Sequence, residues 1–552
     1  MLRREFLSTL CASTVASALP RLEAVLQPDA LDLRAPVRRA MSCISNRMDP
    51  NASYRPWFLV EVKDWKPIRL RHDIWDFGDM SGRFLEALIM ARNMFEPTTG
   101  MLQDEARIRG FLFGLQGSDG LIMNRDQGRV DHMFAQGSAL YGMVTDFNDS
   151  HDPAVKDRVT ALIGGLAKRA RHEDDYLWFP EVATPIAPCS HMAAYQVLPI
   201  VRFYELTNDA SALRYAERLS RWAFYHDPTV TDQGVITKTG WEGHLHAWMD
   251  TYSGILRCSR AGGNIDRREV LARSKLLFAW VKQNYTTPYG WVADSVGSET
   301  CETCTISSAI RLALELIKEG STEYWDDVER FVRNQLVANQ FRDVERLGID
   351  DPATAKGLRG AFESYAAPNT LIASRDSGIE GCCINGGIRG FFLAYQSAIQ
   401  ESKDAIHINL LMSHATSGVR VVSYLPQDGR LDFYPESSKP LLIRLPEWLR
   451  AKDVTVNGPV GIRQAAETDG HFIRVSGAKQ GARIILQFKQ REESVESVVA
   501  KKRYDVAWRG DTVIKLTPGG KPYATYIKEF VSDSLPPMQK QDDLYKKPNV
   551  SW

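Results

Sequence analysis

The sequence TISSAIRLALELIK, residues 305–318, shows which kind of element builds this 552-residue chain. Its apolar residues recur with the spacing i, i+4, i+7, i+8 and i+11: Ile306, Ile310, Ala313, Leu314 and Ile317. This spacing lines one face of an α-helix and leaves the polar residues on the opposite face. The stretch therefore predicts an amphipathic helix that buries one side in a larger core.

Similar patterns fill most of the chain between residues 75 and 400. They predict further helices, joined by short polar turns, at residues 82–93, 134–147, 153–171, 192–206, 210–224, 243–260, 267–283 and 323–338. Helices that follow one another without strands between them pack as helical hairpins. We predict an (α/α)6 toroid over residues 26–403, although the periodicity alone is equally compatible with an open helical solenoid.

Near residue 404 the helical pattern gives way to short alternating or β-branched segments. Examples are IHINLLM, VRVVSYL, LLIRLP, VTVNG, FIRV and RIILQF. Such segments form strands, and Asn457-Gly458 is a favourable hairpin turn. The sequence therefore predicts a multidomain α plus β protein, with an antiparallel β-sandwich over residues 404–500. Residues 501–552 are predicted to hold one more strand pair and a Pro- and Lys-rich extended tail.

The N-terminus, MLRREFLSTLCASTVASALP, combines Arg3 and Arg4 with a mildly apolar run of small residues. This combination is typical of twin-arginine export signals; an ordinary basic amphipathic N-terminus is the alternative. We expect residues 1–25 to be such a signal and the protein to be periplasmic or secreted. No later stretch of sequence reaches the roughly 18 to 20 uninterrupted apolar residues that cross a bilayer, so no membrane span is predicted.

The balance of positive and negative residues limits the kinds of molecule that the chain is expected to bind. Lys plus Arg number 68, as do Asp plus Glu, so the formal net charge is zero. Without excess positive charge the chain has no long-range field to gather a polyanion, which argues against nucleic acid. A neutral or modestly charged substrate is expected. The 13 Trp and 19 Tyr residues suit stacking on sugar rings, although a large core also uses aromatic residues.

Two segments hold half of the eight cysteines: SETCETC at residues 298–304 and GIEGCC at residues 378–383. Each lies just before a predicted helix, where unpaired N–H groups lower the pKa of a thiol. Three sulfurs and one carboxylate from these segments suit tetrahedral zinc (Zn2+). The spacing leaves two alternatives open, unconnected buried thiols and a purely structural zinc site.

Together these segments resemble glycoside hydrolase family 127, the β-L-arabinofuranosidases, whose members pair an ETC motif with a downstream CC motif around zinc. Further similar motifs are DMSGRFLEAL at residues 79–88, GHLHAWMDTYSG at 243–254, DDVERFVRN at 326–334, LIRLPEWL and VTVNG. Each motif is short, but their order extends the resemblance from about residue 75 to residue 520.

The resemblance assigns zinc binding to four residues: Glu302, Cys304, Cys382 and Cys383. Cys382 would also be the nucleophile of a retaining hydrolase. In such a mechanism the thiolate attacks the anomeric carbon, and water later resolves the glycosyl-cysteine. Because ETCETC contains the motif twice, Glu299 and Cys301 form a second register, but the distance to the VER segment favours the first.

The resemblance also points to residues that bind the sugar. His244 and His191, each at a helix start, would donate to hydroxyl groups, and Asp79 belongs to the helix that lines the substrate cavity. Core or helix-capping roles are the alternative for both histidines. His246 lies two residues after His244, so only one of these two is expected to face the cavity. Ser138 replaces a family histidine, which indicates a different sugar pocket.

One departure from the family concerns the general acid. Family members carry a glutamate in a longer loop before the zinc glutamate, whereas this chain has YTTPYGWVADSVGSETC at residues 285–301. General acid catalysis contributes about 10²- to 10⁴-fold to a rate, so another carboxyl group must serve if the chain is an efficient hydrolase. We favour Asp294, with Glu299 and Glu242 as alternatives.

The sequence thus predicts an exported, zinc-dependent retaining glycoside hydrolase for β-L-arabinofuranosides or related glycosides of complex glycans. Two other functions fit parts of the pattern. A helical toroid followed by a β-sandwich also serves polysaccharide lyases, for which Tyr285 and Tyr289 could supply the catalytic groups. A carbohydrate-binding relative with structural zinc is the second alternative.

Overall fold

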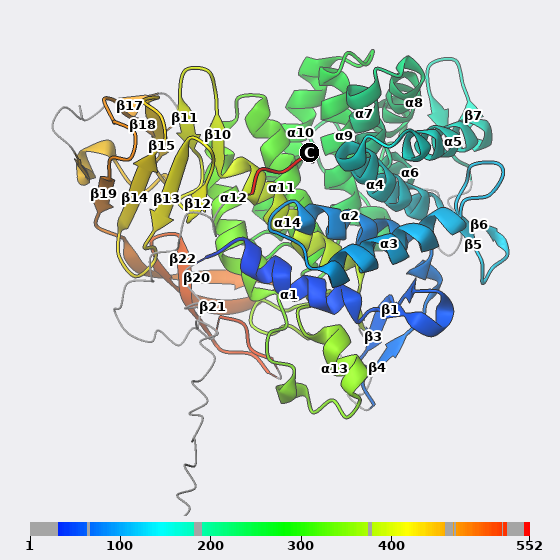
Figure 1. Cartoon of the computed structure of the whole chain (residues 1–552), viewed down its shortest axis with the longest axis horizontal. Helices are drawn as coiled ribbons and strands as arrows, with labels where there is room; N and C mark the ends of the chain where they lie inside the picture. The colour runs from blue at the N-terminus through cyan, green and yellow to red at the C-terminus, as the bar shows by residue number, and fades with distance from the viewer. Residues whose placement is uncertain are drawn as a thin grey trace, which may run out of the picture.

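The computed structural model describes residues 31–62, 67–180, 190–373, 378–458, 467–468, 471–521, 523–526 and 546–552. The predicted signal at residues 1–25 lies outside these ranges. A large helical domain stands beside a smaller all-β part (Figure 1). Among the described helices none combines the length and apolar character that crossing a membrane requires.

The described residues include six helices that form a closed inner ring. They are α2 (Gly78–Arg92), α4 (Met133–Ser150), α7 (Val197–Thr207), α9 (Leu245–Arg260), α11 (Thr303–Lys318) and α14 (Cys382–Ser397). Each contacts the next, and α14 packs back against α2, so the ring closes. A closed ring excludes the open solenoid that the sequence left possible. Most of these helices are buried along nearly their whole length because other elements surround them.

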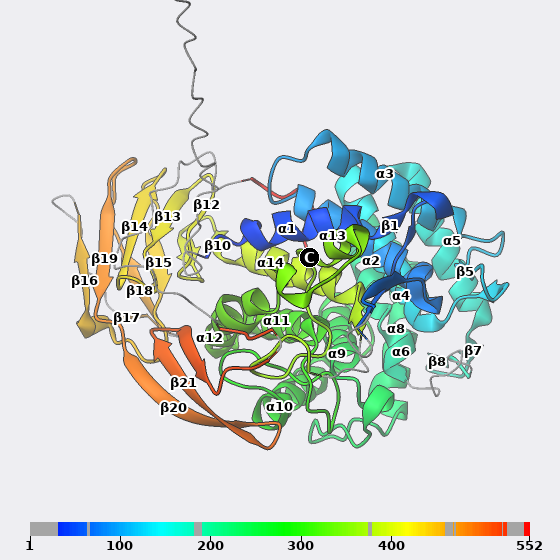
Figure 2. The same cartoon turned by 90° about the horizontal axis from the view of Figure 1, so that it is seen from below.

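A second helix packs outside each member of the inner ring. These outer helices are α3 (Thr99–Gly114), α5 (Pro153–Arg169), α8 (Ala210–Arg221), α10 (Arg267–Tyr285), α12 (Trp325–Phe331) and α1 (Arg34–Ser45). The six inner and outer pairs confirm the predicted (α/α)6 toroid. Helix α1 is the first of the described chain yet packs on α14, the last, so the N-terminal segment completes the sixth pair (Figure 2).

Short elements connect the pairs. They are α6 (Ser190–Ala194), α13 (Pro352–Leu358), β1 (Met48–Asp49), β2 (Arg55–Pro56), β3 (Leu59–Glu61), β4 (Arg69–Arg71), β5 (Met123–Asn124), β6 (Arg129–Val130), β7 (Arg171–His172), β8 (Leu177–Trp178) and β9 (Gly378–Glu380). Strand β9 pairs with β3 and leads directly into α14. Arg47, fully buried, donates to the carbonyl oxygens of Ile379 at 3.2 Å and Phe58 at 3.0 Å. These bonds hold the segment just before the first cysteine of α14.

Two five-stranded sheets form the predicted β-sandwich. The first has the order β10 (Ile399–Glu401), β11 (Ile406–Ile408), β15 (Leu441–Arg444), β18 (Phe472–Val475), β17 (Glu467–Thr468). The second has the order β12 (His414–Ala415), β13 (Val419–Ser423), β14 (Arg430–Pro435), β19 (Ile484–Phe488), β16 (Val454–Asn457). The pairing is antiparallel except between β11 and β15, which run parallel. The inward-facing aliphatic side chains of both sheets share one core.

The predicted hairpin turn at Asn457-Gly458 leads into residues 459–466, which lie outside the described ranges. Among the described strands β16 pairs with β19, and the next described strand, β17, belongs to the other sheet. The predicted boundary at residue 500 differs from the structure, since β20 (Glu492–Val499), β21 (Lys502–Arg509) and β22 (Thr512–Thr517) form one three-stranded sheet. Arg330 of α12 pairs with Asp511 at 2.8 Å and so joins this sheet to the toroid.

Of the predicted extended tail the structure describes residues 546–552, which pack against the toroid; residues 527–545 lie outside the described ranges. Val550 is fully buried, and the backbone N–H of Asn549 donates to Asn93 Oδ1 at 2.6 Å. The Trp552 ring lies 5.5 Å from the ring of Tyr141, inside the toroid. Apolar burial of Val550 and Trp552 therefore fixes residues 546–552, which a polar and Pro-rich composition does not reveal.

Candidate active site

Four side chains that the sequence singles out converge in the structure. One ligand atom from each of Glu302, Cys304, Cys382 and Cys383 lies within 4.8 Å of all the others, and all four residues are buried. The Sγ atoms of Cys382 and Cys383 are 3.8 Å apart, and those of Cys304 and Cys383 are 3.9 Å apart. Two sulfurs at about 2.3 Å from a tetrahedral zinc ion lie about 3.8 Å apart, so the donor atoms fit zinc.

The starts of two helices bring these residues together. Glu302 precedes α11 as its N-cap residue, Cys304 lies in the first turn, and Cys382 and Cys383 are the first two residues of α14. The two helices approach closely at Gly386, where an added Cβ would lie 2.9 Å from Cys304 Cα and 3.0 Å from its Sγ. Glycine at this position therefore permits the sulfurs to meet.

A zinc ion held by these four residues would be expected to bind about 10- to 100-fold more weakly after Gly386→Ala, the loss typical of a disturbed ligand support. The new methyl group would press on the Cys304 backbone and displace one sulfur. Competition against a chromogenic chelator measures the affinity. Gly110→Ala in α3 is a matched control, because a Cβ there meets nothing within 4 Å. Equal zinc affinity in both variants would contradict this account of the helix approach.

The pKa values of the three thiols show that they cannot all ionise easily without a nearby cation. Burial raises the pKa of Cys304, but hydrogen bonds with Cys382 and Cys383 outweigh it and hold the pKa well below the usual range. The contact with Cys304 raises the pKa of Cys382, and burial raises that of Cys383. One sulfur thus ionises at the expense of the others, because adjacent like charges repel. A divalent cation would allow all three to be thiolates.

The structure also separates the two ETC registers. Glu299 is exposed and pairs with Lys501 at 2.9 Å. Cys301 is buried and accepts a hydrogen bond from Asn339 at 3.8 Å, away from the other sulfurs. Glu302 and Cys304 are therefore the members of the motif that can share a metal with the CC pair.

A cavity of about 290 Å³ opens beside this group. Its lining residues are Phe58, Trp75, Asp79, Arg83, Phe134, Gly240, Trp241, His244, His246, Asp294, Ser295, Glu302, Tyr365, Glu380 and Cys382. Cys382 faces the cavity, whereas Cys304 and Cys383 lie behind it with no exposed surface. Of the three sulfurs, Cys382 is therefore the one that a molecule in the cavity can reach.

Both histidines of the GHLH segment line the cavity, so the prediction that only one can do so is wrong. His244 is not helical, because it is the extended N-cap residue of α9 with ψ 108°. The opposite-face rule for residues two apart therefore does not apply. His244 Nε2 lies 2.9 Å from Glu302 Oε2, and His246 Nδ1 lies 2.6 Å from Ser308 Oγ. Burial lowers the pKa of His244, but the Glu302 carboxylate raises it more.

His191 and Asp79 have different positions. His191 lies outside the cavity lining, fully buried against the Trp248 ring at 4.6 Å, and burial lowers its pKa to about 3. The structure does not bring it to the predicted sugar contact. Asp79 does line the cavity, where its Oδ1 accepts hydrogen bonds from Arg83 Nε at 2.8 Å and Ser138 Oγ at 2.5 Å. Arg83 also lines the cavity, and its buried Nη1 has no hydrogen-bond partner among the described residues.

Asp294 lines the cavity as well, but its carboxylate is already occupied. Oδ1 accepts hydrogen bonds from Thr300 at 3.0 Å and from Ser298, and Oδ2 accepts one from Ser295 at 3.0 Å. These three hydroxyl donors hold the Asp294 side chain in its loop.

Glu380 is a carboxyl group in the cavity that the sequence reasoning missed. Its Oε2 lies 3.4 Å from Cys382 Sγ, and its Oε1 accepts a hydrogen bond from Tyr365 OH at 2.9 Å. Burial raises the pKa of Glu380 to about 7, although the bond from Tyr365 acts in the opposite direction. A signal was present, because a glutamate stands two residues before the CC pair in GIEGCC.

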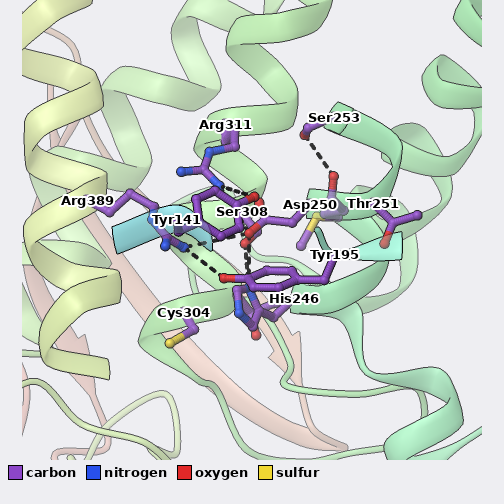
Figure 3. Close-up of polar contacts among 12 residues, drawn as sticks. Tyr141, Tyr195, His246, Asp250, Thr251, Ser253, Cys304, Ser308, Arg311 and Arg389 are labelled. Carbon is purple, nitrogen blue, oxygen red and sulfur yellow. Dashed lines mark hydrogen bonds and ion pairs between the residues drawn. The ribbon is translucent and has the colours of Figure 1, made fainter. Parts of the chain in front are cut away.

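A buried polar network lies in the toroid next to Cys304 (Figure 3). Asp250 accepts from Arg311 at 3.2 Å and pairs with Arg389 at 3.7 Å. Arg311 also donates to Tyr141 OH at 3.1 Å, and Arg389 donates to Tyr195 OH at 3.4 Å. These bonds link α4, α9, α11 and α14. Since removing one partner of a buried ion pair costs about 3–5 kcal/mol, the network fixes the inner helices on which the site stands.

The chain resembles known proteins in structure rather than in sequence. No family model matches the sequence, and no curated protein is significantly similar to it. A GH127 β-L-arabinofuranosidase from Geobacillus stearothermophilus T6 has a similar structure, with a TM-score of 0.59 and 13% sequence identity over 88% of this chain and 81% of that one. Another GH127 β-arabinofuranosidase gives 0.60 and 12% over 87% of this chain and 78% of that one.

A sugar epimerase from a ruminal bacterium is similar over part of this chain. Its TM-score is 0.51 at 10% identity, and the match covers 67% of this chain and 100% of that one. At such identities the comparisons bear on the fold. They confirm the predicted likeness at that level: this chain has the fold of the GH127 β-L-arabinofuranosidases, from which its sequence diverges strongly.

Proposed function

We propose that this protein is a zinc-dependent retaining glycoside hydrolase whose nucleophile is Cys382. The observation that carries the proposal is the convergence of three sulfurs and one carboxylate at the wall of a cavity, with Cys382 alone among the sulfurs facing it. Arg83 and the aromatic rings of Trp75 and Trp241 also line the cavity, and such groups suit a sugar.

Glu302, Cys304, Cys382 and Cys383 would hold the zinc ion, which when bound keeps the thiols deprotonated. Cys382 Sγ then attacks the anomeric carbon, and the bond to the leaving oxygen breaks. Glu380 donates its proton to that oxygen. In the second step a water molecule attacks the same carbon, gives its proton to the Glu380 carboxylate and releases the Cys382 thiolate.

The proposal also names a class of sugar. β-L-arabinofuranosides of complex glycans are the first candidates, because the GH127 structures with a similar fold carry that activity in their names. We also propose that the protein is exported through its twin-arginine-type N-terminus. The six cysteines of the described residues are buried and free of disulfides, which supports folding before export.

The site gives less support to the alternatives. Tyr289 is fully buried against Trp508 and Tyr526, and Tyr285 lies outside the cavity lining, so the lyase candidates do not reach the cavity. A carbohydrate-binding relative would lack an acid beside the sulfur. Glu380 occupies that position.

Purified protein is expected to contain about one zinc ion per chain and to hydrolyse 4-nitrophenyl β-L-arabinofuranoside. NMR of the first product should show the β anomer, because two displacements retain configuration. Removal of the metal with a chelator should abolish activity, and added zinc should restore it. Full activity without metal, or an unsaturated product that absorbs in the ultraviolet, would overturn the proposal.

A further inference from the structure

Trp241 is a large apolar side chain that the fold leaves open to solvent. It is 50% exposed, whereas most large apolar side chains of the described residues are covered. It lines the catalytic cavity together with Trp75. The two indole rings lie 6.1 Å apart with an angle of 17° between their planes. The cavity therefore has a nearly parallel pair of aromatic rings in its wall.

The exposure of Trp241 does not come from a loose loop. Residues Gly240–Gly243 form a short 3-10 helix, which Gly240 enters with a φ of +58° that glycine adopts easily. Behind it, His191 Nε2 lies 3.0 Å from the carbonyl oxygen of Trp241, and Trp248 Nε1 donates to that of Glu242 at 2.8 Å. Both supporting side chains are fully buried. The fold thus holds the indole in place from behind.

The exposed fractions of the lining residues show which end of the cavity is closed and which end is open to solvent. Cys382 and Glu302 are 6% and 7% exposed, so the reacting end of the cavity is closed, whereas the half-exposed Trp241 lies at its open end. A glycoside that places its anomeric carbon at Cys382 has its leaving group extending toward solvent. An indole held at the open end therefore meets the leaving-group side of the substrate.

We infer that Trp241, supported by Trp75, forms a subsite for the leaving group and that this group carries a ring next to the bond that is cleaved. This inference rests on the proposed function. A sugar ring presents a face of C–H groups and an arene presents a π face, and both stack on indole through the same apolar contact. His191 acts here as a positioning residue, because it holds the Trp241 backbone without facing the cavity.

The test compares ligands that share a glycone and differ in the leaving group. The Cys382→Ser protein is titrated calorimetrically with methyl β-L-arabinofuranoside, with 4-nitrophenyl β-L-arabinofuranoside and with a β-L-arabinofuranosyl disaccharide. Adding Trp241→Ala is expected to raise the Kd of the two ring-bearing ligands about tenfold and to leave that of the methyl glycoside within about twofold. Trp241→Phe should restore most of the affinity, and Leu276→Ala, also exposed but outside the cavity, should change nothing.

Each outcome of these titrations either supports or overturns the leaving-group subsite at Trp241. If only the disaccharide loses affinity, the subsite binds a sugar; if only the aryl glycoside does, it binds an arene. Equal losses for all three ligands, or no loss for either ring-bearing ligand, would overturn the subsite and leave the proposed hydrolase standing. If none of the ligands binds the protein that keeps Trp241, the proposed glycone fails, and the subsite fails with it.

Discussion

Replacing Cys382 by serine is expected to lower kcat/KM for glycoside hydrolysis by about 10⁴-fold or more, a loss typical of nucleophile removal. A serine hydroxyl is a far weaker nucleophile than a thiolate at neutral pH. It is also a poor ligand for zinc, so zinc binding should weaken without being lost, because Glu302, Cys304 and Cys383 remain. Initial rates with 4-nitrophenyl β-L-arabinofuranoside and metal analysis of the same sample provide the measurements.

A control variant and a search for a covalent adduct test whether Cys382 is the nucleophile. Cys258→Ala removes another fully buried thiol, on α9 and outside the cavity lining, and should retain hydrolysis. Circular dichroism should show both variants folded. Mass spectrometry of the wild-type protein quenched during turnover should find a glycosyl adduct on Cys382. Unchanged hydrolysis by Cys382→Ser would remove this residue as the nucleophile and with it the proposed mechanism.

Replacing Glu380 by glutamine is expected to lower kcat by about 10²- to 10⁴-fold for glycosides with a sugar leaving group. Glutamine keeps the size of the side chain and can still contact Tyr365, but it has no proton to give to the leaving oxygen. The loss should be much smaller for the 4-nitrophenyl glycoside, because 4-nitrophenolate leaves without protonation. Rates on both substrates and zinc content would be measured together.

Asp294→Asn is the matched control for this experiment. Asp294 also lines the cavity, yet its oxygens are bound by Ser295, Ser298 and Thr300. We expect it to change kcat by less than about tenfold, the effect of weakened loop hydrogen bonds. If Asp294→Asn instead showed the dependence on leaving group and Glu380→Gln did not, the general acid would be Asp294, as the sequence predicts.

Residues close together in the chain were the easier part of the site to predict. ETC and CC each open a helix, and helix starts carry free N–H groups, so their use as ligand positions follows from local rules. His244 and His246 show the limit of such rules. Treating both as helical put them on opposite faces, but the helix begins only after His244, and one residue of difference at a helix end reverses the conclusion.

The general acid shows a second limit. Searching the loop before Glu302 led to Asp294, because the family places its acid there. Strand β9 instead brings Glu380 beside Cys382, and the pairing of β9 with β3 depends on residues more than 300 positions apart in the chain. Glu380 stands only two residues before Cys382 in the chain. That both side chains line the same cavity depends on this long-range pairing, which a local pattern cannot report.

From the sequence alone came the helical hairpins, the change to strands near residue 404 and the four candidate ligands, since these depend on periodicity and on the chemistry of adjacent side chains. Tertiary structure decided the rest. In the folded chain α14 packs on α2 and closes the ring, and α11 and α14 meet at Gly386. Val550 is buried against the toroid, and His191 lies behind Trp241. Contacts between distant segments arise when the whole core packs, and no short stretch of residues contains that information.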